Sequence, residues 1–125
     1  MSRPLRFNLI LALVVAACSS AAPGLGGAPS PAVGKQLFVA KGCIACHVVQ
    51  QIEEARGTVG PSLDGMGDPE RRRTVGGGAL DNTPENLKRW LKDPPAVKPG
   101  TTMPDLSLSA QEIEHLAAFL LTLKE

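Results

Sequence analysis

The sequence predicts an all-α fold: a small domain of three main helices and long loops around one large apolar group. Three segments begin with strong helix start signals, and no segment alternates apolar and polar residues as a strand does. The 125-residue chain holds one tryptophan, three phenylalanines and no tyrosine. Domains of this size usually draw much of their core area from aromatic rings, so a large apolar component is missing from the chain itself.

The first helix is predicted to begin at Pro31, with Ser30 as its N-cap. It runs through PAVGKQLFVAK and ends before Gly42, a residue suited to the left-handed position that follows many helices. Gly34 and Phe38 lie four residues apart and therefore share one face.

Two further helices follow later in the chain. One begins with Thr83 as N-cap and Pro84 as its first residue, and ends before Pro94. The last begins at a capping box formed by Ser109 and Glu112. Its apolar face comprises Ile113, Leu116, Ala117, Leu120 and Leu121.

Two long segments, residues 48–80 and 94–108, are rich in glycine, proline and aspartate. We expect them to be ordered loops rather than helices or strands. Loops this long are uncommon in a compact domain unless they are functional or enclose something.

The N-terminus has the features of an export signal. Arg3 and Arg6 precede an apolar run over residues 9–18 that is too short to span a bilayer. The end of this run, VAAC, resembles the lipobox of bacterial lipoproteins, which implies that Cys18 is acylated and becomes the first mature residue. Ordinary cleavage at a small-residue site is the alternative.

These features divide the chain into a signal peptide (1–17), a lipidated Cys18 with a flexible linker (18–30) and a folded domain (31–125). We therefore expect the domain on the extracytoplasmic face of a bacterial membrane or in the periplasm. The full chain has 13 basic and 12 acidic residues, and loses Arg3 and Arg6 with the signal. This near-neutral balance gives no support for nucleic-acid binding.

The motif CIACH at residues 43–47 admits four readings: a zinc site, a redox dithiol, a structural disulfide or covalent haem attachment. Zinc needs about four ligands, usually from two separated pairs, and the chain has no second pair. A thioredoxin-like dithiol follows a strand, and none is predicted here. A disulfide leaves the histidine unexplained. Covalent attachment of haem c explains all three residues: Cys43 and Cys46 bond to its vinyl groups, and His47 is an axial ligand to the iron.

A second axial ligand completes an electron-transfer haem, and Met66, Met103 and His115 are the candidates. His115 lies within the last helix and is read as a helix-surface or helix-boundary residue. Met66 follows His47 closely in sequence and is read as a gap-filling loop residue. Met103 lies in a loop between two helices, where Pro104 restricts the backbone, so it is favoured.

The order of GCIACH, GPSL (60–63), Trp90, KPGTTMPDL and EIEHLAAFLLTL resembles that of the class I cytochromes c over residues 31–125. The resemblance implies that Gly34 and Phe38 cross the last helix near Leu116 and Phe119. It also implies that the Pro61 carbonyl orients His47 and that Trp90 lies near a haem propionate. The segment NTPENLKRWLKDPPAVKPGTTMPDL is similar to the cytochrome c domain of caa-type oxidase subunit II.

These observations predict a monohaem, His/Met-ligated electron carrier rather than an enzyme. The resemblance implies a terminal oxidase as acceptor and a quinol–cytochrome c reductase or similar donor. The alternatives are a haem-bearing subunit of a multi-subunit oxidoreductase, such as a thiosulfate-oxidising complex, and a gas sensor with a labile sixth position. The basic run Glu70–Arg73 is read either as a partner patch or as a solvated loop.

Overall fold

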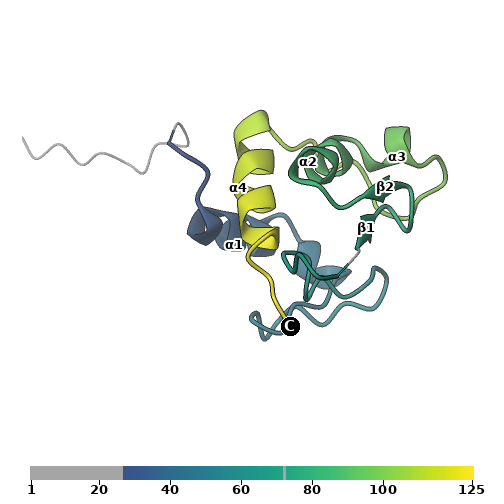
Figure 1. The fold of residues 1–125 in the computed structure, drawn as a ribbon. Coiled ribbons are helices and arrows are strands. Elements are labelled where there is room, and N and C mark those ends of the chain that lie inside the picture. The colour runs from purple at the N-terminus through teal and green to yellow at the C-terminus, as the bar shows by residue number, and fades with distance from the viewer. Residues whose placement is uncertain (1–26, 72) are drawn as a thin grey trace, which may run out of the picture.

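Helices α1 (Pro31–Ala40) and α4 (Ala110–Leu120), from opposite ends of the folded part, pack across one another (Figure 1). The structure is a computed structural model that describes residues 27–71 and 73–125, so the predicted signal and Cys18 lie outside the described residues. Between α1 and α4 the chain forms the 3-10 turn η1 (Cys43–Ala45), strands β1 (Thr74–Val75) and β2 (Leu80–Asp81), and helices α2 (Pro84–Lys92) and α3 (Pro94–Val97).

The three predicted helices are confirmed, and each begins at its predicted cap. The hydroxyls of Ser30 and Thr83 accept the backbone N–H of the residue three positions later, at 3.4 and 3.1 Å. At Ser109 the capping box is complete: its hydroxyl accepts the Glu112 N–H at 3.2 Å, and its own N–H donates to the Glu112 carboxylate at 2.8 Å.

The crossing of α1 and α4 depends on Gly34. A Cβ at this position would lie 2.6 Å from the Phe119 Cβ and would overlap the His115 carbonyl, so only glycine allows this approach. One turn later, Phe38 meets Phe119 edge-to-face with ring centroids 5.8 Å apart. His115, 4% exposed, accepts the Ser30 N–H on its Nδ1 at 2.9 Å and thereby ties the start of α1 to α4.

The turn η1, the β1–β2 hairpin and the short helix α3 were not predicted. Strands β1 and β2 form an antiparallel hairpin, pairing Thr74 with Asp81 and Val75 with Leu80. Strands of two residues are too short to show an alternating pattern. The short helix α3 begins at the prolines that were read only as the end of α2; Asp93 caps it, accepting the Ala96 N–H at 3.0 Å. Proline fits the first turn of a helix, so one signal both ends α2 and starts α3.

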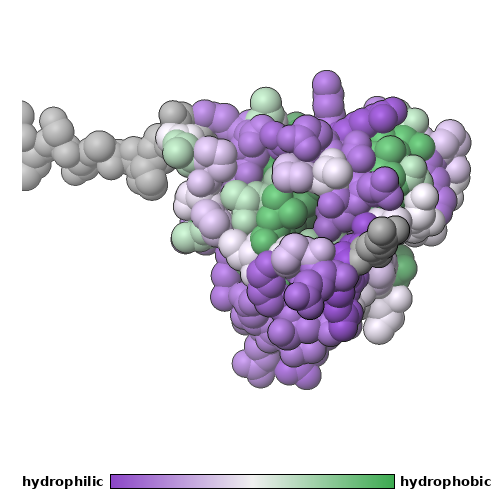
Figure 2. Space-filling view, viewed as in Figure 1, coloured by the Kyte–Doolittle hydropathy of each residue, from purple (hydrophilic) through white to green (hydrophobic). Residues whose placement is uncertain are grey.

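The described part of the long loop, residues 48–71 and 73, contributes to the core. The face of the molecule in Figure 2 is mainly hydrophilic along this loop, whereas apolar residues reach the surface beside α4 and around α3. The inward side chains of the loop are buried in the core; they are Val49, Ile52, Ala55 and Met66. In the part of the chain that the structure describes, no helix has the length and apolarity needed to cross a bilayer.

Replacing Gly34 by alanine tests the crossing. Alanine is the better helix former by about 1 kcal/mol, so a free surface helix would gain stability. Here we expect the free energy of unfolding to fall by about 1–3 kcal/mol, because the new methyl group must push the two helices apart. Denaturant unfolding measures the change, with Gly27→Ala, where a Cβ meets nothing within 4 Å, as the control. A Gly34→Ala protein as stable as the wild type would contradict this account.

The Glu112 carboxylate should give the fold an acid-sensitive contact. The Lys41 ammonium, 2.7 Å away, and the Ser109 N–H hold the pKa of Glu112 below its ordinary value. A lowered folded-state pKa stabilises the fold at neutral pH, and this contribution disappears as the pH falls through that pKa. Glu112→Gln keeps the capping box and removes the charge, so we expect a loss below about 1 kcal/mol at neutral pH that vanishes in acid.

Thermal unfolding across the pH range checks this, with Glu53→Gln, whose side chain is 87% exposed, as the control. A difference between Glu112→Gln and wild type that stays constant into strong acid would refute the linkage.

Candidate haem site

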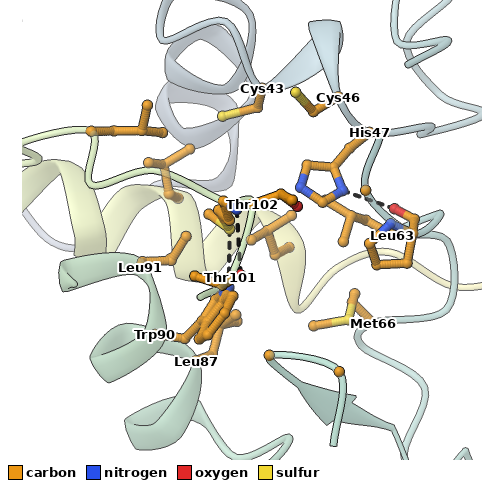
Figure 3. A pocket seen from close by; sticks show the side chains of 18 of the residues that line it. Cys43, Cys46, His47, Leu63, Met66, Leu87, Trp90, Leu91, Thr101 and Thr102 are labelled. Carbon is orange, nitrogen blue, oxygen red and sulfur yellow. Dashed lines mark hydrogen bonds between the residues drawn. The ribbon is translucent and has the colours of Figure 1, made fainter. Parts of the chain in front are cut away.

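A cavity of about 810 Å³ lies between the helices and the two long loops (Figure 3). Ligand pockets commonly measure about 300–1,000 Å³, so this one has room for a large organic group. Its apolar walls come from three helices and comprise Phe38, Leu87, Leu91, Leu116 and Leu120. The cavity has room for the large apolar component that the scarcity of aromatic residues indicated is missing from the chain itself.

The CIACH segment forms a tight turn at one end of this cavity. Gly42 has a φ of +78° and redirects the chain after α1. The N–H groups of Cys46 and His47 both donate hydrogen bonds to the Cys43 carbonyl oxygen, at 3.2 and 3.0 Å. The side chains of Cys43, Cys46 and His47 all line the cavity (Figure 3). Both thiols are free. The turn therefore brings two thiols and an imidazole to the same end of the cavity.

The environment of Cys43 does not suit a redox dithiol. Burial is the largest cause and raises the pKa of the Cys43 thiol above its usual value. A backbone hydrogen bond lowers this pKa, and the neighbouring Cys46 raises it. Attacking thiols in disulfide exchange have lowered pKa values, because the thiolate is the nucleophile. Both free thiols line the apolar cavity, where each can form a thioether to a bound group.

The His47 ring is fixed by the loop that follows it. Its Nδ1 lies 2.8 Å from the Pro61 carbonyl oxygen, which can only accept, so Nδ1 carries the proton and Nε2 keeps a free lone pair. A Cβ on Gly60 would lie 2.6 Å from Nδ1, so the backbone approaches the ring closely there. An imidazole held by a carbonyl on one nitrogen is the usual arrangement for a metal-ligating histidine.

Met103 enters the cavity from the loop that follows α3 and begins at Lys98. The loop makes a turn in which the Thr101 N–H donates to the Lys98 carbonyl oxygen at 3.1 Å, and Gly100 within this turn has a φ of +82°. The Trp90 Nε1–H then donates to the Met103 Sδ at 3.1 Å. The thioether is thus held in place by a helix residue, and the only N–H of the indole is directed at sulfur.

The other candidate ligands occupy different positions. Met66 is 5% exposed and also lines the cavity, but it lies beside Leu63 on the same side as His47 (Figure 3). Trp90, Leu87 and the threonines next to Met103 lie across from them. Of the two readings of His115, the helix-surface one is wrong: the residue is buried at the boundary between α1 and α4 and is not among those that line the cavity.

Sequence reasoning missed four basic residues that line the cavity: Lys41, Arg71, Arg73 and Lys98. Arg71 and Arg73 belong to the run read as a partner patch or a solvated loop; Arg72 lies outside the described residues. No acidic residue is found among the described residues that line the cavity. The four come from separate segments, so only the fold brings them together.

Comparisons with known proteins agree with this geometry. The cytochrome c family matches residues 31–124. Cytochrome c oxidase subunit 2 of Bacillus sp. (strain PS3) is 38% identical over 95 residues, which cover 73% of this chain and 25% of that protein. Cytochrome c2 of Agrobacterium tumefaciens (strain II Chrys) is 33% identical over 102 residues, covering 72% of this chain and 88% of that one. A chain of the SoxXA crystal structure from P. pantotrophus superimposes with a TM-score of 0.61 at 26% identity, over 80% of this chain and 85% of that one.

The matched region spans about a quarter of the oxidase subunits and most of cytochrome c2. The family and the two cysteines together imply one covalently bound haem c. The site fits this group: an apolar cavity is lined by two thiols at one end, by a histidine with a free Nε2 and by a thioether held at Trp90. From its sequence, its fold and the donors in its cavity, the chain is a member of the cytochrome c family of electron carriers.

Proposed function

We propose that this protein is an exported, membrane-tethered monohaem cytochrome that passes single electrons to a terminal oxidase. The observation that carries the proposal is that His47, Met103 and the two thiols of Cys43 and Cys46 all line one apolar cavity. The Met103 sulfur is held there by Trp90, which lies across the cavity from His47 (Figure 3). Membership of the cytochrome c family supports a redox role rather than a catalytic one.

Each residue has a distinct part in this proposal. Cys43 and Cys46 would hold the haem covalently, and His47 would offer its free Nε2 to the iron. Met103 would offer its sulfur as a second ligand, with Pro104 restricting the backbone after it. The haem, when bound, supplies one-electron redox chemistry. Two ligands from the protein would favour outer-sphere electron transfer over gas binding.

The cavity also favours a high reduction potential. Thioether ligation raises the potential relative to a second histidine. The Trp90 N–H withdraws electron density from the Met103 sulfur, which weakens its donation to the oxidised iron and acts in the same direction. The mainly apolar lining would also disfavour the more highly charged oxidised iron, which again raises the potential.

The oxidase is proposed as the acceptor because the matched domain is part of cytochrome c oxidase subunit 2 in the relatives. In such a protein the domain is joined to the oxidase by the chain itself. Here we propose that an acylated Cys18 and the 18–30 linker replace that connection by holding the domain at the membrane surface. The donor would be a quinol–cytochrome c reductase or a similar complex.

A second candidate is a haem-bearing subunit of a multi-subunit oxidoreductase, such as a thiosulfate-oxidising complex. The observation that favours it is the likeness to a chain of SoxXA, which covers most of both chains. Such a subunit works only with its catalytic partner. Isolation of the protein from its native membrane in a stable complex with a catalytic subunit would support this candidate over the mobile carrier.

Met103→Ala should remove the sixth ligand. The charge-transfer band of methionine-ligated ferric haem should disappear from the optical spectrum, and the midpoint potential should fall, because water or hydroxide replaces a thioether. Met66→Ala is the matched control: it also truncates a methionine that lines the cavity, but on the side of His47. Loss of the band in Met66→Ala and its retention in Met103→Ala would reverse the ligand assignment.

Cys18→Ser should release the carrier from the membrane without loss of haem. Intact-mass measurement should show haem and lipid on the native protein, and haem alone on the variant. With purified terminal oxidase in vesicles, the native protein should reduce the oxidase faster than the variant at equal total concentration, since a short flexible tether gives an effective concentration on the order of millimolar. Equal rates would argue against tethered delivery, and no oxidase reduction by either protein would exclude this acceptor.

A further inference from the structure

The basic residues of the cavity fall into two classes. Lys41 and Arg71 are neutralised by carboxylates outside the cavity, Lys41 by Glu112 at 2.7 Å and Arg71 by Glu125. Arg73 and Lys98 also line the cavity, but no carboxylate of the described residues lies within salt-bridge distance of either. The half-buried Arg73 and the exposed Lys98 thus lie at the edge of this largely apolar cavity with no carboxylate partner among the described residues.

Arg73 is held in place from the loop side. Its guanidinium donates to the Ser62 carbonyl at 3.1 Å and also to the Asp64 carbonyl. These two contacts use two of its five N–H groups and contribute no negative charge. The remaining donors of a positioned guanidinium are free for an acceptor in the cavity.

Lys98 approaches the same end of the cavity from the segment after α3. Its ammonium lies against the turn of the β1–β2 hairpin, so close that a Cβ on Gly77 would lie 3.0 Å from Nζ. Gly76 and Gly77 both have positive φ, +65° and +62°, and a Cβ on Gly76 would lie 2.7 Å from the Trp90 ring. The glycines thus leave room for an ammonium and an indole beside the hairpin.

The hairpin lies across the cavity from the cysteines. Figure 3 shows Cys43 and Cys46 at one end and the hairpin strand at the other, and Arg73 immediately precedes β1. Haem carries its two vinyl groups and its two carboxylates on different edges of the ring. Thioethers to Cys43 and Cys46 would therefore direct the carboxylates toward the hairpin, where a desolvated carboxylate requires a cation or hydrogen-bond donors.

We propose that Arg73 and Lys98 bind the two haem carboxylates, and that Trp90 instead serves the Met103 sulfur. This inference rests on the proposed haem-binding function. It differs from the role that the family resemblance implies for Trp90, because the single indole N–H is used by sulfur. Positive charges near the iron favour its reduced form, so both residues also raise the reduction potential.

The test compares Lys98→Gln and Arg73→Gln with Lys92→Gln in the haem-loaded protein. Lys92 ends α2 outside the cavity lining and gives the same change in net charge. For each cavity variant we expect the equilibrium constant for one-electron reduction to fall about tenfold, which is about 59 mV. The propionate bending band in the resonance Raman spectrum should shift as well, whereas Lys92→Gln should leave both unchanged.

Two further variants separate binding from folding. Arg73→Lys keeps the charge and should retain most of the potential even though the two carbonyl contacts change. Trp90→Phe removes the indole N–H and keeps a ring, so the propionate band should remain at its wild-type position. Unchanged potential and Raman band in both cavity variants, or a propionate shift in Trp90→Phe alone, would overturn the assignment. A chain without covalent haem, in contrast, would overturn the proposed function itself.

Discussion

The close approach of α1 and α4 at Gly34 is the contact on which the rest of the structure depends. It brings the two ends of the folded part together, and Phe38, Leu116 and Leu120 from this helix pair continue into the cavity wall. Because α1 ends at Ala40 and η1 begins at Cys43, the orientation of α1 also determines where the two thiols and His47 are placed. A packing contact outside the site thus sets the geometry of one end of it.

The helices could be predicted because their signals are local. Ser30, Thr83 and Ser109 satisfy exposed N–H groups within three residues of themselves, and this chemistry is visible in the sequence. The hairpin and α3 could not be predicted in the same way. Two paired residues carry no periodicity, and Pro94 reads as a helix end although it is also a helix start.

The candidate site likewise has parts that local sequence signals could predict and parts that they could not. The CIACH turn and the carbonyl partner of His47 come from short segments with defined spacing, and the geometry around Pro61 agrees with the resemblance. The partner of the Trp90 N–H and the cations Arg73 and Lys98 depend on how separate loops meet. Arg73 lies within a basic run that has the composition of a solvated loop, so its inward direction follows from tertiary packing alone.

The hydrogen bond from the Ser30 N–H to the buried His115 has a mechanical consequence. Residues 27–30 enter the fold beside α1 and α4, whereas the hairpin and α3 lie on the other side of the molecule (Figure 1). A pulling force on the chain before residue 27 would be borne by this bond and by the helix crossing behind it. The load would bypass the loops that carry Met103 and Arg73. The donor atoms in the cavity would therefore keep their positions under such a force.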